Sequence, residues 1–329
     1  MKRRVFMKTV SGFAAYALLA TPLSARAQQT GKIARIGWIA GGAGALPTPA
    51  YLAALREGLR ERGWTEGRNY VMEAAWGERD DARKLTAELV AKGADVLVVQ
   101  GAMIFGARQE AKDVPIVIGF SGDPIEAKLV KSFAEPAGNI TGMAMQGVEL
   151  VGKRLEVLKE ALPNLTRVAI VANPGHAGER SELKYSQAAA QQLGVKIQYL
   201  PVSGLKEFTP AYEAILREKA EAIVAFPDAL LMSQAKAIAA FSTQHRLPAV
   251  SGWSEFVDAG NMMSYGPNLR ESWRQAAGFV DKILRGARPA QLPIEQPTRF
   301  ELVINAKVAR TLGIKVPDSL LLRADRIVT

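Results

Sequence analysis

Apolar residues recur along the chain in two patterns that alternate with each other. Short runs rich in β-branched residues, such as residues 33–40, predict buried strands. Segments with apolar residues three or four positions apart predict amphipathic helices, and the clearest is residues 148–162, which ends before Pro163. A Gly- and Asn-rich passage at residues 138–142 separates two halves that repeat this alternation. The pattern therefore predicts an α/β protein rather than an all-α or all-β one.

The predicted elements are numerous enough for two sheets. Strands that alternate with helices favour parallel sheets covered on both faces, so we expect two doubly wound, Rossmann-like lobes with a ligand cleft between them. The predicted strands are residues 33–40, 71–74, 95–99, 114–120, 167–172, 195–200, 222–226 and 247–250. The predicted helices include residues 51–62, 80–92, 105–112 and 148–162.

Small, polar and aromatic residues follow these predicted strands. The carboxyl ends of parallel strands share one edge of a sheet, and ligands of such folds bind there, so these positions predict a binding cleft. Glycine at a strand end also lets backbone N–H groups approach a ligand. The candidate ligand-binding residues are Gly42, Gln100, Gly101, Ser121, Asp123, Asn173, Gly175, His176, Phe226, Asp228, Ser251 and Trp253.

These side chains suit different parts of a solute. Asn173, with the glycine two residues later, suits a carboxylate, whereas Asp123 and Asp228 suit an ammonium group. Phe226 and Trp253 suit an apolar or aromatic side chain. Each residue also has an ordinary structural interpretation, because Asp after a strand often caps a helix and Asn-Pro-Gly often forms a turn.

Composition narrows the class of protein. The chain has 329 residues, of which 48% are hydrophobic, and a chain with that much apolar matter folds. It has no cysteine, which excludes disulfides, thiol nucleophiles and cysteine-based metal sites. Its two histidines, His176 and His245, are too few for most histidine metal sites. We therefore expect neither a metal nor a cofactor.

The net charge of +10 is concentrated at the amino end. The first 27 residues hold five basic residues and no acidic one, which leaves 37 basic and 32 acidic residues, a net charge of +5, in the remainder. A charge this modest over about 300 residues is typical of a solvated surface, so we expect no nucleic-acid partner.

The first 27 residues have the layout of a secretory signal peptide. A basic start is followed by an apolar stretch at residues 10–23 and by Ala-Arg-Ala at residues 25–27, a pattern that a signal peptidase cleaves. Residues 3–8 read Arg-Arg-Val-Phe-Met-Lys, which resembles the twin-arginine export signal, although an ordinary Sec signal with two arginines is the alternative. The apolar stretch is shorter than the ~20 residues that span a bilayer. We expect cleavage near Ala27 and a periplasmic mature chain.

Motifs of known enzymes are incomplete in this chain. Residues 119–123 read Gly-Phe-Ser-Gly-Asp, so Asp123 stands where the nucleophile elbow has its second glycine. Residues 42–47 begin like a dinucleotide fingerprint, but Pro47 replaces the third glycine. His176 and His245 lack sequence partners for a catalytic dyad, so we expect no catalytic residue.

An ordered set of short motifs carries a family resemblance. Besides the export signal, the set consists of Glu-Gly-Arg-Asn at 66–69, Pro-Ile-Val-Ile at 115–118, Gly-Asp-Pro at 122–124, Pro-Ala-Gly-Asn-Ile-Thr-Gly at 136–142, Asn-Pro at 173–174, Met-Ser-Tyr-Gly-Pro at 263–267 and Phe-Glu-Leu-Val-Ile-Asn at 300–305. Together these motifs resemble the ABC-transporter substrate-binding proteins of the tryptophan/tyrosine type, which have a type I periplasmic binding fold.

The resemblance implies a receptor that closes on a small solute and docks on an ABC permease in the inner membrane, without catalysis, and we expect it to be a monomer. It implies an N-terminal lobe of residues 32–145 plus 261–293 and a C-terminal lobe of residues 146–260 plus 294–329. The ligand contacts of the family fall on the strand-end positions given above, Asp123 and Asp228 among them. Two departures leave an amino-acid ligand open: Asn-Pro-Gly at 173–175 replaces a serine-rich carboxylate loop, and Phe226 brings an aromatic ring to the second lobe.

Two other functions stay open at this stage. A ligand sensor for a membrane signalling protein would have the same sequence features as a transport receptor. An enzyme on the same architecture is disfavoured because no nucleophile, base or metal set is recognisable. A transcription regulator of this fold is excluded, because the export signal occupies the place of its DNA-binding domain.

Overall fold

The computed structural model describes residues 33–41, 48–145 and 150–329. These residues belong to one compact unit, Ile33–Thr329. The predicted signal peptide at residues 1–27 and the predicted site residue Gly42 lie outside the described residues.

The first sheet is built entirely of parallel strands. Its five strands are arranged in the order β2-β1-β3-β4-β5. Helices α1 (Thr48–Glu61) and α10 (Leu269–Leu284) pack on one face, and α2 (Ala82–Ala91) and α3 (Ile104–Glu110) on the other. Because both faces are covered, the central strands consist almost entirely of buried residues. The strands are β1 Ala34–Gly41, β2 Tyr70–Gly77, β3 Val96–Gln100, β4 Ile116–Phe120 and β5 Ile140–Ala144.

The second sheet has seven strands in the order β12-β11-β10-β9-β8-β6-β7. All of its neighbouring strands are parallel except β10 and β11, which are antiparallel. Its strands are β6 Arg167–Ala172, β7 Lys196–Pro201, β8 Ala222–Ala225, β9 Ala249–Ser251, β10 Met263–Pro267, β11 Phe300–Asn305 and β12 Arg326–Val328. The helices of this half are α4 Leu150–Ala161, α5 Glu179–Leu193, α6 Phe208–Arg217, α7 Ala229–Ser233, α8 Ala235–His245, α9 Ser254–Asp258, α11 Ala306–Leu312 and α12 Asp318–Arg323.

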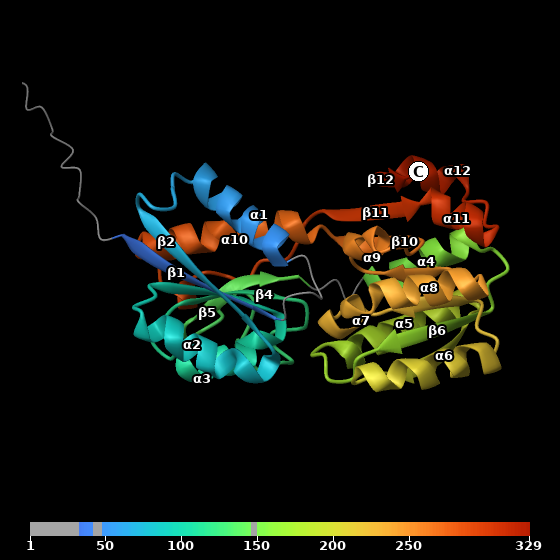
Figure 1. Cartoon of the computed structure of the whole chain (residues 1–329), viewed down its shortest axis with the longest axis horizontal. Helices are drawn as coiled ribbons and strands as arrows, with labels where there is room; N and C mark the ends of the chain where they lie inside the picture. The colour runs from blue at the N-terminus through green and yellow to red at the C-terminus, as the bar shows by residue number, and fades with distance from the viewer. Residues whose placement is uncertain (1–32, 42–47, 146–149) are drawn as a thin grey trace, which may run out of the picture. The chain divides into compact units, whose positions relative to one another are not determined.

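The segment that follows β9 connects the two sheets. We expected residues 261–293 to join the N-terminal lobe, and their helix α10 does pack beside α1, as Figure 1 shows. Their strand β10, however, pairs with β9 and β11 in the second sheet. The apolar faces of α1 and α10 share one core with β1 and β3, which fixes α10 on the first sheet although its own strand belongs to the second.

Strand β5 lies where the sequence suggested only a glycine-rich connection. Gly142 in its middle has a φ of +132°, and a Cβ there would lie 2.3 Å from the carbonyl oxygen of Ile118. Glycine is required because β5 approaches the neighbouring strand this closely. The same residue that suggested a loop is thus needed inside the sheet.

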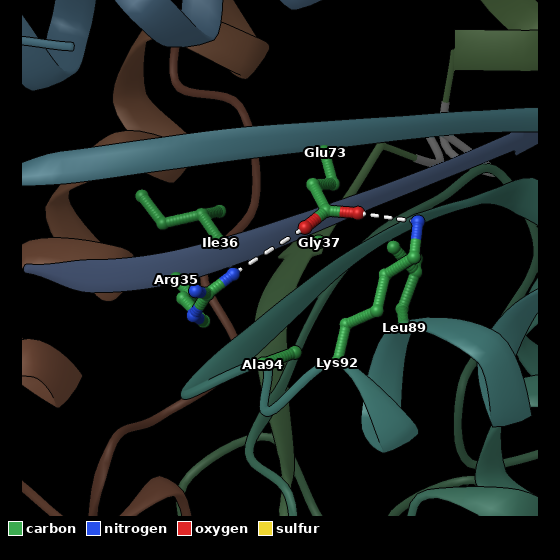
Figure 2. A pocket seen from close by; sticks show the side chains of 7 residues that line it. All are labelled: Arg35, Ile36, Gly37, Glu73, Leu89, Lys92 and Ala94. Atoms are coloured by element: carbon green, nitrogen blue, oxygen red, sulfur yellow. Dashed lines mark hydrogen bonds and ion pairs between the residues drawn. The ribbon is translucent and has the colours of Figure 1, made fainter. Parts of the chain in front are cut away.

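The outer edge of the first sheet carries an ion-pair cluster rather than a binding cavity. Glu73 of β2 lies between Arg35 of β1, at 3.5 Å, and Lys92 after α2, at 2.6 Å, as Figure 2 shows. The recess beside these side chains has a volume of about 10 Å³, which holds at most one water molecule. A solute site must therefore lie elsewhere.

Candidate functional site

A cavity lies at the carboxyl ends of strands from both sheets. Its volume is about 530 Å³, within the range of about 300–1,000 Å³ that is typical of small-molecule sites. Most of its wall is apolar or aromatic, with a few polar side chains. The lining residues include Gly41, Glu78, Arg79, Gln100, Gly101, Met103, Phe105, Phe120, Ser121, Met145, Asn173, Gly175, His176, Leu205, Asp228, Leu230, Trp253, Leu269 and Trp273.

The first sheet contributes a polar group whose hydrogen-bonding capacity is not used. Gln100 is the last residue of β3, and its side chain is only 8% exposed. Its Oε1 atom is buried without a hydrogen-bond partner among the described residues. An unpaired buried acceptor costs free energy, so a donor on a bound solute would relieve that cost.

The second sheet contributes a connected set of polar groups. After β6, the Oδ1 atom of Asn173 accepts a hydrogen bond from the backbone N–H of Gly175 at 2.9 Å, which forms a tight turn. The side-chain amide of Asn173 donates to Oδ1 of Asp228 at 3.3 Å. Asn173 therefore fixes both its own turn and the carboxylate that follows the neighbouring strand β8.

Asp228 is a helix cap and a cavity-lining residue at once. Its Oδ1 atom accepts hydrogen bonds from the backbone N–H groups of Leu230, at 2.7 Å, and Leu231, at 3.4 Å, at the start of α7. These hydrogen bonds and the one from Asn173 all end on Oδ1, so within the described residues Oδ2 has no hydrogen-bond donor. With the side chain 7% exposed, Oδ2 is the acceptor that this carboxylate can offer to a solute.

Two side-chain hydrogen bonds link the halves near the cavity. Ser121, after β4, and His176, after β6, lie 2.9 Å apart between Oγ and Nε2. Tyr51 of α1 donates to Glu255 of α9 at 2.8 Å. No partner for His176 was predicted, whereas the fold brings Ser121 to it. Among the described residues no carboxylate is hydrogen-bonded to the imidazole, so the pair lacks the third group that orients a catalytic histidine.

Aromatic rings form the apolar part of the wall. Trp253 follows β9, and Trp273 reaches the cavity from α10. Trp273 packs edge-on against Trp38 of β1, with ring centroids 4.8 Å apart, and stacks on Tyr51 at 6.4 Å. Each contact fixes the orientation of the Trp273 ring, so the wall offers a preformed surface for an apolar solute.

A buried ionic cluster lies behind the second-sheet wall. Arg154 and Glu182, each with a side chain 1% exposed, are 3.9 Å apart, and Arg154 Nε donates to the carbonyl of Tyr265 at 2.9 Å. Burial raises the pKa of Glu182 to about 7, with smaller contributions from Asp228 and Glu179 that act in the same direction.

His176 lines the cavity and interacts electrostatically with Asp228 and Glu179. Desolvation of the imidazole lowers the pKa of His176 below its ordinary value, which outweighs the opposite effect of Asp228 and Glu179. The imidazole is therefore neutral near pH 7 and can accept or donate one hydrogen bond at Nε2.

The structure brings together most of the predicted site residues that it describes. Eight of them line the cavity: Gln100, Gly101, Ser121, Asn173, Gly175, His176, Asp228 and Trp253.

Three predicted residues are not among the lining residues. Asp123 turns back on its own loop, where Oδ1 accepts hydrogen bonds from the backbone N–H groups of Ile125, at 2.7 Å, and Glu126, at 3.1 Å. Phe226 and Ser251, each 1% exposed, are packed inside the second half. Asp123 and Asp228 thus both cap a turn or helix, but only Asp228 is among the lining residues.

Several lining residues were not predicted. Glu78 and Arg79 follow β2, which continues to Gly77, whereas the sequence pattern ended that strand at Ala74. The apolar residues Ala75 and Trp76, which continue the run beyond Ala74, were the available signal for the longer strand. Trp273 comes from the middle of a helix, so no rule about strand ends would have found it.

No group of three or more His, Asp or Glu side chains among the described residues is arranged to hold a metal ion. Within the residues that the structure describes, no helix is both long enough and apolar enough to cross a membrane.

Two α/β sheets with a solute-sized cavity at their strand ends define a solute-binding protein of the periplasmic-binding type. The chain belongs to the ABC transporter substrate-binding protein family, because the model of that family matches residues 49–328. Members of this family bind substrate and act outside the cytoplasm.

Relatives and solved structures agree with this assignment. A tyrosine-binding protein of Clostridioides difficile is 20% identical over 260 residues, which cover 78% of this chain and 74% of the relative. A conserved domain protein from Vibrio cholerae has a similar structure, with a TM-score of 0.83, 28% identity, and coverage of 90% of this chain and all (100%) of the other. A Streptococcus domain solved in complex with L-Trp has the same TM-score, 0.83, with 22% identity and the same coverage, 90% and 100%. The predicted fold class and the family resemblance are thus confirmed.

The Glu182 carboxyl generates a prediction about pH. Its folded-state pKa of about 7 lies above the ordinary value of 4.5, so its contribution to stability is complete below pH 4.5 and is lost as the pH rises to about 7. Glu182→Gln lacks this titration. Relative to the wild type, the variant should therefore gain roughly 2 kcal/mol of unfolding free energy between pH 5 and pH 8, as urea denaturation measures it.

The control is Glu156→Gln, which removes an exposed carboxyl of α4 that pairs with Lys153. Its unfolding free energy should follow the wild-type pH profile. A Glu182→Gln profile parallel to that of the wild type would contradict the assigned titration.

Proposed function

We propose that this protein is the extracytoplasmic receptor of an ABC importer and that it binds a small organic solute in the cavity between the two sheets. The observation that carries the proposal is the cavity of about 530 Å³, whose polar groups come from both sheets. A solute bound there would contact both halves at once, and hinge closure around it would present a new surface to a permease. The protein acts as a monomer in this proposal.

The wall favours a solute with an apolar body and a donor-bearing head. Trp253, Trp273 and Phe120 supply apolar surface, while Oε1 of Gln100 and Oδ2 of Asp228 are acceptors with no donor among the described residues. An ammonium group can donate hydrogen bonds to both acceptors, and its bond to a carboxylate is charge-assisted. We therefore propose an apolar or aromatic amino acid as the solute class, which agrees with the tyrosine and L-Trp named for two relatives.

A thermal-shift screen of the mature protein tests this function. A solute that binds only the folded state stabilises it by about 2.7 kcal/mol at one hundred times its Kd. Tryptophan, tyrosine, phenylalanine and leucine should raise the Tm, whereas sugars should not. Absence of a shift with every amino acid would reject the proposed solute class.

Asp228 allows a sharper test, because its capping and binding roles can be separated. Asp228→Asn keeps an Oδ1 acceptor for the α7 N–H groups but removes the charge facing the cavity. The affinity for the amino acid should fall about tenfold or more, with little change in Tm, since charge-assisted hydrogen bonds contribute roughly 1.5–3 kcal/mol. Calorimetry measures the affinity.

Asp123→Asn is the matched control, because that carboxylate also caps a turn but does not line the cavity. Its affinity should equal that of the wild type. An unchanged affinity in Asp228→Asn would exclude an ammonium contact at this carboxylate.

We further propose that residues 1–27 are a cleaved twin-arginine signal that delivers the protein to the periplasm, on the basis of the Arg-Arg-Val-Phe-Met-Lys sequence at 3–8. Replacing Arg3 and Arg4 by lysine should leave uncleaved precursor in the cytoplasm, which fractionation and immunoblotting detect. Normal export of that variant, together with loss of export when the Sec pathway is blocked, would assign the Sec route instead.

A further inference from the structure

Among the described residues, three charged side chains line the cavity: Glu78 and Arg79 from the first half and Asp228 from the second. Arg79 is the only lysine or arginine among the lining residues that the structure describes, and it comes from the first half. It belongs to the short 3₁₀ turn Arg79–Asp81 that follows β2. The carboxylate that faces the cavity from the second half is Asp228, which is 7% exposed.

Arg79 is oriented by an aromatic ring rather than by an acid. Its guanidinium carbon lies 5.3 Å from the centroid of the Phe105 ring, which in turn packs edge-on against Phe120 at 6.0 Å, and both rings line the cavity. Such stacking occupies one face of the guanidinium and leaves its N–H groups, which lie in its plane, available to a ligand.

No carboxylate within the described ranges lies at ion-pair distance from Arg79. Arg83, one turn further along, does pair with Glu110 at 2.7 Å. The neighbouring Asp81 is engaged locally, since its Oδ2 accepts the backbone N–H of Glu78 at 2.8 Å. Arg79 therefore keeps its donors for a group that enters the cavity.

The second half contributes a carboxylate to the cavity and holds further acidic groups near it. Behind Asp228 lie Glu179 and Glu182, which are 5% and 1% exposed, and one buried cation, Arg154. Burial keeps Glu182 partly protonated near pH 7 by raising its pKa, but Asp228 and Glu179 still outnumber the nearby cation, so this wall attracts a cationic group and repels an anionic one.

The Asn173 turn does not offset this repulsion. Its side-chain amide donates to Asp228, and its Oδ1 accepts the N–H of Gly175. The turn was predicted to bind a carboxylate, but the polar atoms of Asn173 are hydrogen-bonded within the turn and to Asp228. An anionic group placed there would lie beside a carboxylate.

We propose that Arg79 binds the carboxylate of the solute, so that an amino acid lies across the cavity with its carboxylate toward the first half and its ammonium group toward Asp228. This inference rests on the proposed function, because it assigns one more contact in the same cavity. Arg79 is then the residue that selects amino acids over the corresponding amines, since an amine of the same shape lacks the group that the guanidinium binds.

Calorimetry with matched ligand pairs tests the assignment. The ligands are L-tryptophan, L-tyrosine, L-phenylalanine and L-leucine, each compared with the amine that lacks its carboxylate: tryptamine, tyramine, phenethylamine and isoamylamine. The wild type should bind the preferred amino acid about tenfold or more tightly than its amine. Arg79→Gln should lower the affinity for the amino acid by a similar factor and leave the affinity for the amine unchanged. Arg79→Lys, which keeps the charge, should retain part of the preference.

Arg68→Gln is the control, because Arg68 is an exposed arginine of the same half that does not line the cavity. It should preserve the wild-type preference. If Arg79→Gln binds amino acid and amine with the wild-type ratio, the assignment of Arg79 is wrong while the receptor function stands. If the wild type binds no member of the panel, the proposed solute class and the assignment both fail.

Discussion

The cavity depends on the packing of Trp273 against Gly119. A Cβ atom on Gly119 of β4 would lie 2.2 Å from the indole ring of Trp273, so only glycine allows α10 to lie this close to the first sheet. The ring is held from its other sides by Trp38 and Tyr51. Because α10 follows a strand of the second sheet, this contact ties a segment of one half into the core of the other.

Behind the second-sheet wall of the cavity lie charged groups that are costly to bury. Arg154 and Glu182 lose their hydration, and within the described residues Nη1 of Arg154 and Oε2 of Glu182 have no hydrogen-bond partner. Removing two charges from water costs several kcal/mol for each ion, which a contact at 3.9 Å offsets only in part. The raised pKa of Glu182 is one expression of that cost.

Much of the fold followed from periodicity alone. The strand at Arg167–Ala172 has the predicted ends, and the helix predicted at 148–162 is α4, Leu150–Ala161. β5 was missed because the glycine that its close packing requires is also typical of loops. β2 was predicted too short, since its half-buried residues form a weaker hydrophobic pattern than the central strands do.

The candidate site was predictable where it depends on topology and not where it depends on local capping. The rule that ligands bind at the ends of parallel strands located Gln100, Asn173 and Asp228. It could not distinguish Asp228, which caps α7 and still faces the cavity, from Asp123, which caps a turn outside it. The same rule could not predict Trp273, because that ring reaches the cavity from a helix and not from a strand end.

The route of α10 also has a consequence for how such receptors are dissected or recombined. A single cut of the gene before residue 150 would separate β1–β5 from the helix that covers one of their faces, and the fragment would expose Trp38, Leu55 and Leu59 to water. Chimaeras that exchange one half between relatives therefore need three crossover points, one between β5 and α4 and one on each side of α10. Recombination at these three points preserves the shared core, whereas a simple fusion divides it.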